Sequence, residues 1–307
     1  LIFSTALSVF CYIALVYFHK NFPSLYTLEI STINLFYYFN SFNIFFLLII
    51  YGFYFNFILD QTKKELRVEK IKTDSLLLNI LPKSIADDLK HFGKTNPKKY
   101  ENVTVLFTDF AGFTKIANTM SPEELVKELD NCFSYFDQVT KKYNLEKIKT
   151  IGDSYMICGG IPISNKTHPI DAILAALEIQ AFMNQMKEIK SNLNLEFWEL
   201  RLGINTGPLV AGVIGEMKFV YDVFGDTVNT ASRMESSGEI GKINIAKSTY
   251  EYVKDFFDCE FRGFIQAKNK GQIEMYFVKG IKGNLSLNSD GKIPNEEFKK
   301  KYLEYQT

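Results

Sequence analysis

The chain has 307 residues, with 35 Lys or Arg and 35 Asp or Glu, so its formal net charge is zero. A neutral chain has no long-range field that would steer it to nucleic acid, and we expect no nucleic-acid partner. The charge is unevenly spread, because residues 1–59 contain only two charged side chains, Lys20 and Glu29. The sequence therefore predicts an apolar first section and a water-exposed second section.

The four cysteines stand far apart and form no Cys-x-x-Cys pair. This spacing predicts neither a disulfide framework nor a zinc site. The cysteines are Cys11, Cys132, Cys158 and Cys259.

Two uncharged runs, residues 1–18 and 33–59, are predicted to be transmembrane helices. The hydrocarbon core of a bilayer requires about 20 apolar residues in a helix. The segment after residue 59 is dense in Lys and Arg, which places the C-terminal side in the cytoplasm. We expect a multi-pass protein of the cell membrane, in contact with membrane lipid; two buried core helices in a soluble domain are the less favoured alternative.

Residues 60–99 are predicted to be a helical linker that leaves the membrane. Charges alternate in sign, some apolar residues recur at seven-residue spacing, and Pro82 ends the first helix. A second short helix, Ser84–Phe92, precedes Gly93. Two interpretations stay open from the residues alone: a plain spacer helix, or a stalk that pairs two subunits and transmits a signal.

An apolar strand, Asn102–Phe107, leads into the segment TDFAGFT at residues 108–114. A carboxylate at the end of a strand, here Asp109, offers the hard oxygen ligands that Mg²⁺ prefers. Backbone N–H groups at the start of a helix after Phe110 could face an anion. A single Asp at a strand end is a weak signal taken alone.

The segment EKIKTIGD, residues 146–153, is followed by the apolar run Ser154–Cys158. A short alternating strand, Gly-Asp and a second strand predict a tight β-hairpin. Lys149 and Asp153 are four residues apart, so both would lie on one face of the hairpin. An ordinary polar hairpin tip is the alternative.

The remaining pattern predicts three more helices and five more strands. One helix begins at Ser121-Pro122 and runs to about Tyr143, and the last carries Asn229 and Arg233 on one face because they are four residues apart. The other elements are a helix at His168–Ile189 and strands within Glu199–Val213 and at Phe219–Phe224, Ile243–Ala246, Phe256–Phe264 and Ile273–Val278. The order strand, helix, hairpin, helix, strand resembles a ferredoxin-like core with added strands and helices, in the α+β class.

Four motifs together resemble the class III nucleotidyl cyclases: FTDFAGFT, EKIKTIGDSYM, RLGINTG and YDVFGDTVNTASRM. The upstream segment SLLLNILPKSIADDLK looks like the short transducer that precedes many cyclase domains, which favours the signalling stalk. We therefore expect membrane helices in residues 1–59, a transducer linker in 60–99, a cyclase catalytic domain in 100–281 and a loose polar tail in 282–307.

The resemblance implies an antiparallel homodimer whose active sites are shared between subunits. It assigns two divalent ions, Mg²⁺ or Mn²⁺, to Asp109 and Asp153. From the same subunit, the triphosphate would meet Arg201 and the backbone of Phe110, Ala111, Gly112 and Phe113. The other subunit would supply Lys149 and Asp222 to the adenine, Asn229 to the ribose region, and Arg233 and Lys268 to the phosphates.

The pair Lys149 and Asp222 implies adenine rather than guanine. A carboxylate accepts from adenine N6, an ammonium donates to a ring nitrogen, and guanine presents the reverse pattern at that edge. Guanylyl-type members carry an acidic residue at the lysine position and Cys or Ser at the aspartate position. The expected reaction converts ATP to 3′,5′-cyclic AMP and pyrophosphate.

Two alternatives remain: a guanylate cyclase, and a non-catalytic, nucleotide-binding signalling protein of the membrane. Degenerate members of the family usually lose a metal-binding Asp or the Asn/Arg pair. This chain retains all four residues, which weighs against the second alternative.

Overall fold

The computed structural model describes residues 10, 12–14, 16–18, 20–21, 29–215, 219–267 and 271–306. The chain divides into two compact units, Leu1–Ser75 and Leu76–Thr307.

The first unit is dominated by helix α2 (Ile30–Leu78), which is 49 residues long and continues into the second unit. Its most apolar 18-residue window has a mean hydropathy of 2.0, and no residue of that window is buried. By length and composition α2 could cross a membrane, as expected for residues 33–59. Most of the other expected span, residues 1–18, lies outside the described residues. Within the described part α2 is the one candidate span, so a multi-pass arrangement is not supported.

The second unit opens with the junction between α2 and helix α3 (Lys83–Phe92). The predicted short helix is confirmed; it follows Pro82 and ends at Gly93, whose φ of 68° is left-handed and suits glycine. Leu81 and Ala86 are buried against the sheet. The segment around Pro82 is therefore packed onto the sheet of the second unit.

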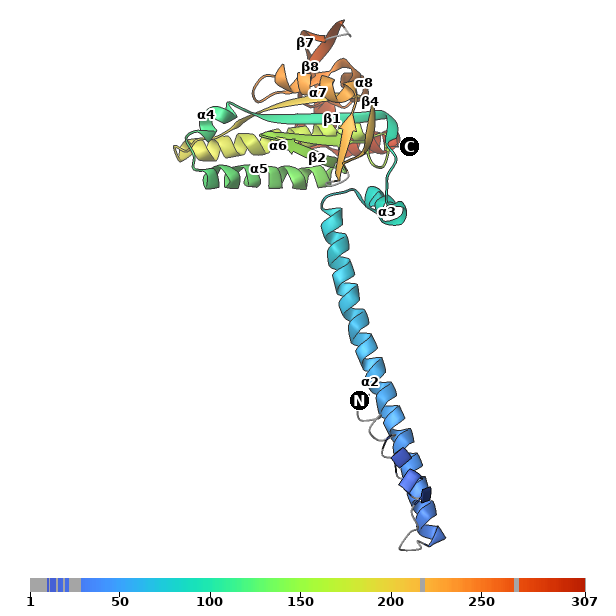
Figure 1. Ribbon diagram of the computed structural model, residues 1–307. Coiled ribbons are helices and arrows are strands. Elements are labelled where there is room, and N and C mark those ends of the chain that lie inside the picture. Colours follow the sequence, from blue (N-terminus) through green and yellow to red (C-terminus); the bar gives the residue numbers. More distant parts are fainter. Residues whose placement is uncertain are drawn as a thin grey trace. The chain divides into compact units, whose positions relative to one another are not determined.

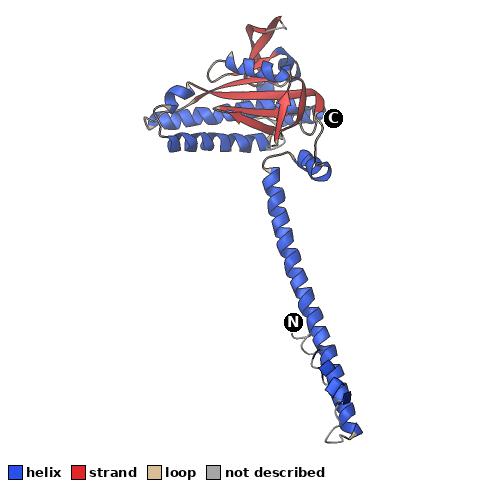
Figure 2. Ribbon diagram, viewed as in Figure 1, coloured by secondary structure: helices blue, strands red, loops and turns tan. Residues whose placement is uncertain are grey.

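Eight strands of the described chain form one sheet, drawn as arrows in Figures 1 and 2. The strand order is β2-β3-β1-β4-β6-β8-β7, and β5 pairs with β4. All pairs are antiparallel except β4 with β6. The strands are β1 (Lys98–Ala111), β2 (Glu146–Ile151), β3 (Ser154–Gly159), β4 (Glu199–Ile214), β5 (Val220–Phe224), β6 (Ile243–Ala246), β7 (Phe257–Ala267) and β8 (Gly271–Ile281).

Seven α-helices lie in the described part of the second unit, and six of them come after β1 in the sequence. Helices α5 and α6 lie side by side beneath the sheet in Figure 1. The helices are α4 (Phe113–Ala117), α5 (Pro122–Lys142), α6 (His168–Asn192), α7 (Asp226–Ser236), α8 (Lys247–Val253), α9 (Glu296–Gln306) and the α3 helix already described, with 3₁₀ turns at Gly283–Leu285 and Leu287–Ser289.

Strand β1 shows how the sequence builds a core on both faces of the sheet. Val105 and Phe107 belong to one buried cluster, whereas Leu106 and Phe110 belong to the other. Successive side chains of a strand point to opposite faces, so a continuous apolar run fills both cores. The α+β class and the added elements are as expected.

Two local predictions are confirmed in detail. Helix α5 begins with a capping box, in which Ser121 and Glu124 exchange hydrogen bonds. The hairpin predicted around residues 146–158 is β2 and β3, with Gly152 at a left-handed φ of 63° in the turn. The hairpin tip therefore presents Asp153 beside the end of β1.

The C-terminal segment differs from the loose tail that we expected. Helix α9 places Phe298 in the core, where its ring lies 5.3 Å from that of Phe256. The Tyr302 hydroxyl donates to Asp171 at 2.7 Å. Three aromatic residues, Phe298, Tyr302 and Tyr305, suffice to dock this polar helix on the core. The segment was too short and too polar for its periodicity to stand out.

We expect the second unit to lose stability as the pH falls from about 6.5 to 4 because of His168. Its ring is buried, its Nδ1 lies 2.8 Å from the Thr104 hydroxyl, and burial lowers its pKa to about 4. Since the unfolded histidine titrates near 6.5, only the unfolded state gains a proton in this window, and folding weakens. Melting curves at several pH values should show a shallower slope for His168→Gln than for a matched surface variant, His91→Gln. Equal slopes would contradict the prediction.

Candidate active site

Asp109 lies near the end of β1 and accepts hydrogen bonds from side chains of the two adjacent strands. The Ser154 hydroxyl of β3 donates to Asp109 Oδ1 at 2.8 Å. Arg201 of β4 stands opposite Asp109 in the antiparallel register, and its Nη2 donates to Oδ2 at 2.6 Å. The carboxylate is thus fixed by strand pairing and by two side chains.

Asp153 lies in the turn between β2 and β3. Burial raises the pKa of its carboxyl group, and the nearby charge of Asp109 raises it further. A carboxylate whose ionisation is hindered by a neighbouring carboxylate marks a place where a cation is favoured. The structure therefore brings together the two residues predicted to bind metal.

The donor set fits divalent ions that also take ligands from a nucleotide. Two carboxylates supply hard oxygen, and Mg²⁺ is usually held by one or two carboxylates together with substrate phosphates and water. Within the described residues no group of three or more His, Cys, Asp and Glu is poised to hold a metal by itself. An ion at Asp109 and Asp153 would accordingly complete its coordination with water and, when nucleotide is bound, with triphosphate oxygens.

The predicted anion-binding turn follows Asp109 directly. Gly112 has a left-handed φ of 71° and precedes the five-residue helix α4. The rings of Phe110 and Phe113 lie 4.9 Å and 5.6 Å from that of Trp198, which anchors both ends of the turn in the core. The backbone of Phe110, Ala111, Gly112 and Phe113 is therefore held next to the two carboxylates.

Lys149 and Asp222 meet as an ion pair. Lys149 Nζ lies 2.6 Å from Asp222 Oδ2, although the residues come from β2 and β5. The Asp222 side chain is 13% exposed, and its other oxygen accepts from the Val223 amide at 2.9 Å. The pair thus offers a hydrogen-bond donor and an acceptor side by side at a partly buried position.

Helix α7 carries Asn229 and Arg233. Asn229 is exposed and Arg233 half-buried. The helix is held close to the sheet, because a Cβ at Gly203 would lie 1.9 Å from the Glu235 amide nitrogen. Its other end is held by the Thr227 hydroxyl, which donates to the Pro208 carbonyl at 2.6 Å.

Arg201, expected at the phosphates, lies between Asp109 and Glu235, at 2.6 Å and 3.2 Å. Lys268 lies outside the described residues.

Our reading of the sequence missed Ser154 and Glu235. Ser154 follows the predicted metal-binding Asp153 and bonds to Asp109. Glu235 comes two residues after Arg233, and nothing in its residue type or spacing marked it as a partner of Arg201. Glu235 reaches Arg201 only because β1 and β4 pair in this register and α7 packs closely on β4.

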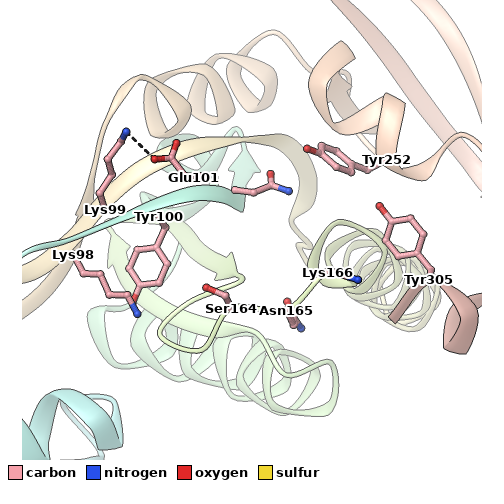
Figure 3. Close-up of a pocket in the computed structure, with 10 residues that line it drawn as sticks. Lys98, Lys99, Tyr100, Glu101, Ser164, Asn165, Lys166, Tyr252 and Tyr305 are labelled. Carbon is pink, nitrogen blue, oxygen red and sulfur yellow. Dashed lines mark ion pairs between the residues drawn. The ribbon is translucent and has the colours of Figure 1, made fainter. Parts of the chain in front are cut away.

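A cavity of about 640 Å³ lies elsewhere, at the start of β1, and Figure 3 shows its lining. Tyr100 and Asn102 line it, together with Tyr252 and Tyr305. Asn102 precedes Asp109 by seven residues of strand, roughly 23 Å at 3.3 Å per residue. This cavity is therefore not part of the site built around Asp109.

Residues 95–280 match the family described as the adenylate and guanylate cyclase catalytic domain. An adenylate cyclase of Mycobacterium tuberculosis (strain ATCC 25618 / H37Rv) is 40% identical over 218 residues, which are 71% of this chain and 48% of the relative. The human guanylate cyclase soluble subunit beta-2 is 37% identical over 223 residues, 72% of this chain and 35% of the relative. The chain thus spans about half the length, or less, of these curated relatives.

Solved structures agree with both the fold and the family. The adenylyl cyclase CyaB from P. aeruginosa has a TM-score of 0.57 and 28% identity, covering 60% of this chain and 96% of its own. A rhodopsin-guanylyl cyclase core with converted specificity, in complex with ATPαS, has a TM-score of 0.56 and 36% identity, covering 60% and 98%. The chain belongs to the class III nucleotidyl cyclases, with the adenylate and guanylate cyclase catalytic domain at residues 95–280.

Proposed function

We propose that this protein is an adenylate cyclase, which converts ATP to 3′,5′-cyclic AMP and pyrophosphate. The observation that carries the choice of base is the Lys149–Asp222 pair at 2.6 Å. Its carboxylate can accept from adenine N6, and its ammonium can donate to a ring nitrogen. Adenylate and guanylate cyclases resemble the chain at 40% and 37% identity, so the argument for ATP rests on these two residues.

The reaction joins the ribose 3′-oxygen to the α-phosphorus of the same nucleotide and releases pyrophosphate. Asp109 and Asp153 would hold two divalent ions, Mg²⁺ or Mn²⁺, which when bound supply Lewis-acid stabilisation of the phosphate oxygens. Asn229 would orient the ribose, and Arg233 would offset charge on the phosphates. Lys268 is proposed for the same role as Arg233, and Arg201 for a phosphate contact.

We further propose that two copies pair antiparallel and share their sites. Asp109 and Asp153 would then serve one nucleotide, while Lys149, Asp222 and α7 of the same chain serve the other. The apolar α2 helix would anchor the enzyme in the cell membrane with its catalytic domain in the cytoplasm, and the linker would carry a signal to it. Receptor-type guanylate cyclases are among the relatives, at 38% identity for one from Caenorhabditis elegans.

The choice of base can be tested by exchanging the pair. The unaltered chain should favour ATP over GTP by about 100-fold in kcat/KM, since two mismatched buried polar groups cost roughly 1–3 kcal/mol each. Lys149→Glu with Asp222→Cys should lose ATP turnover and gain GTP turnover, measured as cyclic nucleotide released. Lys147→Glu on the same strand, which breaks a surface pair with Asp137, should keep the ATP preference.

A chain that turns over GTP faster than ATP would replace this proposal with guanylate cyclase. A pure, folded dimer that cyclises neither nucleotide with Mg²⁺ or Mn²⁺ would favour a non-catalytic nucleotide-binding role.

A further inference from the structure

Three ionic side chains form a continuous chain from β1 to α7. Asp109 Oδ2 meets Arg201 Nη2 at 2.6 Å, and Arg201 Nε meets Glu235 Oε1 at 3.2 Å. The Glu235 side chain is only 10% exposed, whereas that of Arg201 is 30% exposed. Arg201 is thus a cation placed between two carboxylates, Asp109 and Glu235. Glu235 is the more buried of the two, and the sequence predicted no role for it.

Glu235 is an unexpected residue at this depth. Burial raises its pKa to about 7, and the charge of Asp109 acts in the same direction, while Arg201 opposes both. A buried carboxylate is costly unless it is paired. The close approach of α7 at Gly203 brings Glu235 to Arg201 despite this cost.

The two carboxylates compete for one guanidinium. Any positive charge that Arg201 directs at Asp109 opposes a divalent ion at the same carboxylate, because like charges repel strongly in a partly buried setting. Glu235 forms an ion pair with Arg201 from the far side, without a hydrogen bond between the two contacting atoms, and offsets that charge. Removing the negative charge of Glu235 should leave Arg201 bound more tightly to Asp109.

We propose that Glu235 is a positioning residue of the metal site, which holds the Arg201 guanidinium and offsets its charge beside Asp109. This inference rests on the proposed function, because it takes Asp109 as a metal ligand. It adds a role for α7: Glu235 and Arg233 are two positions apart, on opposite sides of the helix. The inner side then serves Asp109, while the outer side presents Arg233.

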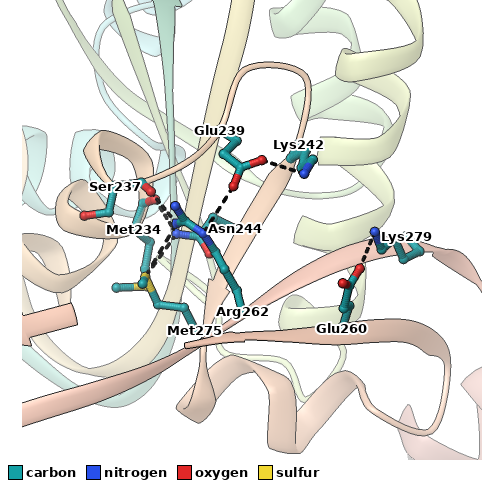
Figure 4. A network of polar contacts seen from close by, with 9 residues as sticks. All are labelled: Met234, Ser237, Glu239, Lys242, Asn244, Glu260, Arg262, Met275 and Lys279. Carbon is teal, nitrogen blue, oxygen red and sulfur yellow. Dashed lines mark hydrogen bonds and ion pairs between the residues drawn. The ribbon is translucent and has the colours of Figure 1, made fainter. Parts of the chain in front are cut away.

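The same end of α7 has a second set of contacts that provides a control. Figure 4 shows Arg262 of β7 on the Ser237 carbonyl and beside Glu239, and Asn244 of β6 donating to the Met234 carbonyl at 2.7 Å. None of these contacts involves Arg201 or Asp109. A purely structural role for Glu235 would resemble the role of this network.

The test is a titration of the full chain in detergent with Mn²⁺ alone, followed by the loss of the free-ion EPR signal. Glu235→Gln keeps the size of the side chain and should weaken Mn²⁺ binding about 10-fold, the lower range for groups that orient metal ligands. Glu239→Gln, which loses the surface pairs with Lys242 and Arg262, should bind Mn²⁺ as the unaltered chain does. Adding Arg201→Gln to Glu235→Gln should restore binding, because the competing charge is gone.

The outcomes separate this inference from the proposed function. If Asp109→Asn binds Mn²⁺ as tightly as the unaltered chain, the proposed metal site is wrong. If Asp109→Asn loses Mn²⁺ and Glu235→Gln does not, the role of Glu235 alone is overturned. Should Glu235→Gln fail to fold, Arg201→Gln alone decides: tighter Mn²⁺ binding supports the charge argument, and unchanged or weaker binding overturns it.

Discussion

Replacing Asp109 with Asn is expected to reduce cyclic AMP formation by about 1,000-fold or more. The carboxylate stands at the end of β1 with Asp153 beside it, and the two are the proposed ligands of both metal ions. Metal ions contribute several kcal/mol of charge stabilisation, and each 1.36 kcal/mol corresponds to tenfold in rate. Initial rates with saturating ATP and Mn²⁺ would measure the loss.

The reason for the loss can be separated from damage to the fold. Asp258→Asn, an exposed carboxylate on β7, is the matched control and should retain full activity. Asp109→Asn should melt close to the control, since the asparagine oxygen can still accept from Arg201 while its NH₂ group donates to the Ser154 hydroxyl, which can accept. An Asp109→Asn enzyme with near-normal turnover would remove Asp109 from the metal site and with it the two-ion scheme.

Where the sequence carried strong local signals, the fold could be predicted closely. The capping box at Ser121 and Glu124 fixed the start of α5. The Gly-Asp turn after an alternating strand identified the β2–β3 hairpin, because only a few residue types suit a left-handed turn position. Such signals depend on neighbouring residues, which the sequence displays directly.

The site could be predicted in part, since the carboxylates and base-reading residues lie within recognisable motifs. Lys149 and Asp222 were expected to act together because both lie in recognised motifs, although 73 residues separate them. Glu235 could not be found, because its significance comes from Gly203 and the tight approach of α7 to β4. That contact arises only in the packed fold, and no periodicity or residue spacing in the sequence indicates it.

The C-terminal segment is a second case in which tertiary contacts could not be predicted from the sequence. Its composition is polar, and the few aromatic residues of α9 are recognisable as core residues only through their contacts with the buried Phe256 and Asp171. A docked helix and a loose tail can therefore share one composition. The tertiary partner decides between them.

Coexpressing an Asp109→Ala chain with an Asn229→Ala chain should restore activity that neither homodimer has. In the shared-site dimer one site of the heterodimer combines both substitutions and stays inactive. The other site draws its carboxylates from the Asn229→Ala chain and its α7 from the Asp109→Ala chain, so it is intact. With random pairing about half the dimers are heterodimers, each with one of two sites working, which predicts about one quarter of the normal activity.

The positions of the site residues within one chain allow this experiment to distinguish shared sites from separate ones. Asp109, Lys149 and Asp222 come from strands of a single sheet, and Asp153 lies in the turn between two of its strands. Helix α7 is held against that sheet at both of its ends. An Asp258→Asn chain mixed with Asp109→Ala supplies a control in which the partner chain is intact in every site residue. Differential tags on the two chains allow the heterodimer to be isolated and its rate measured per dimer. A purified heterodimer without activity would mean that each chain builds its own complete site, and the proposed sharing of α7 across the dimer would then be wrong.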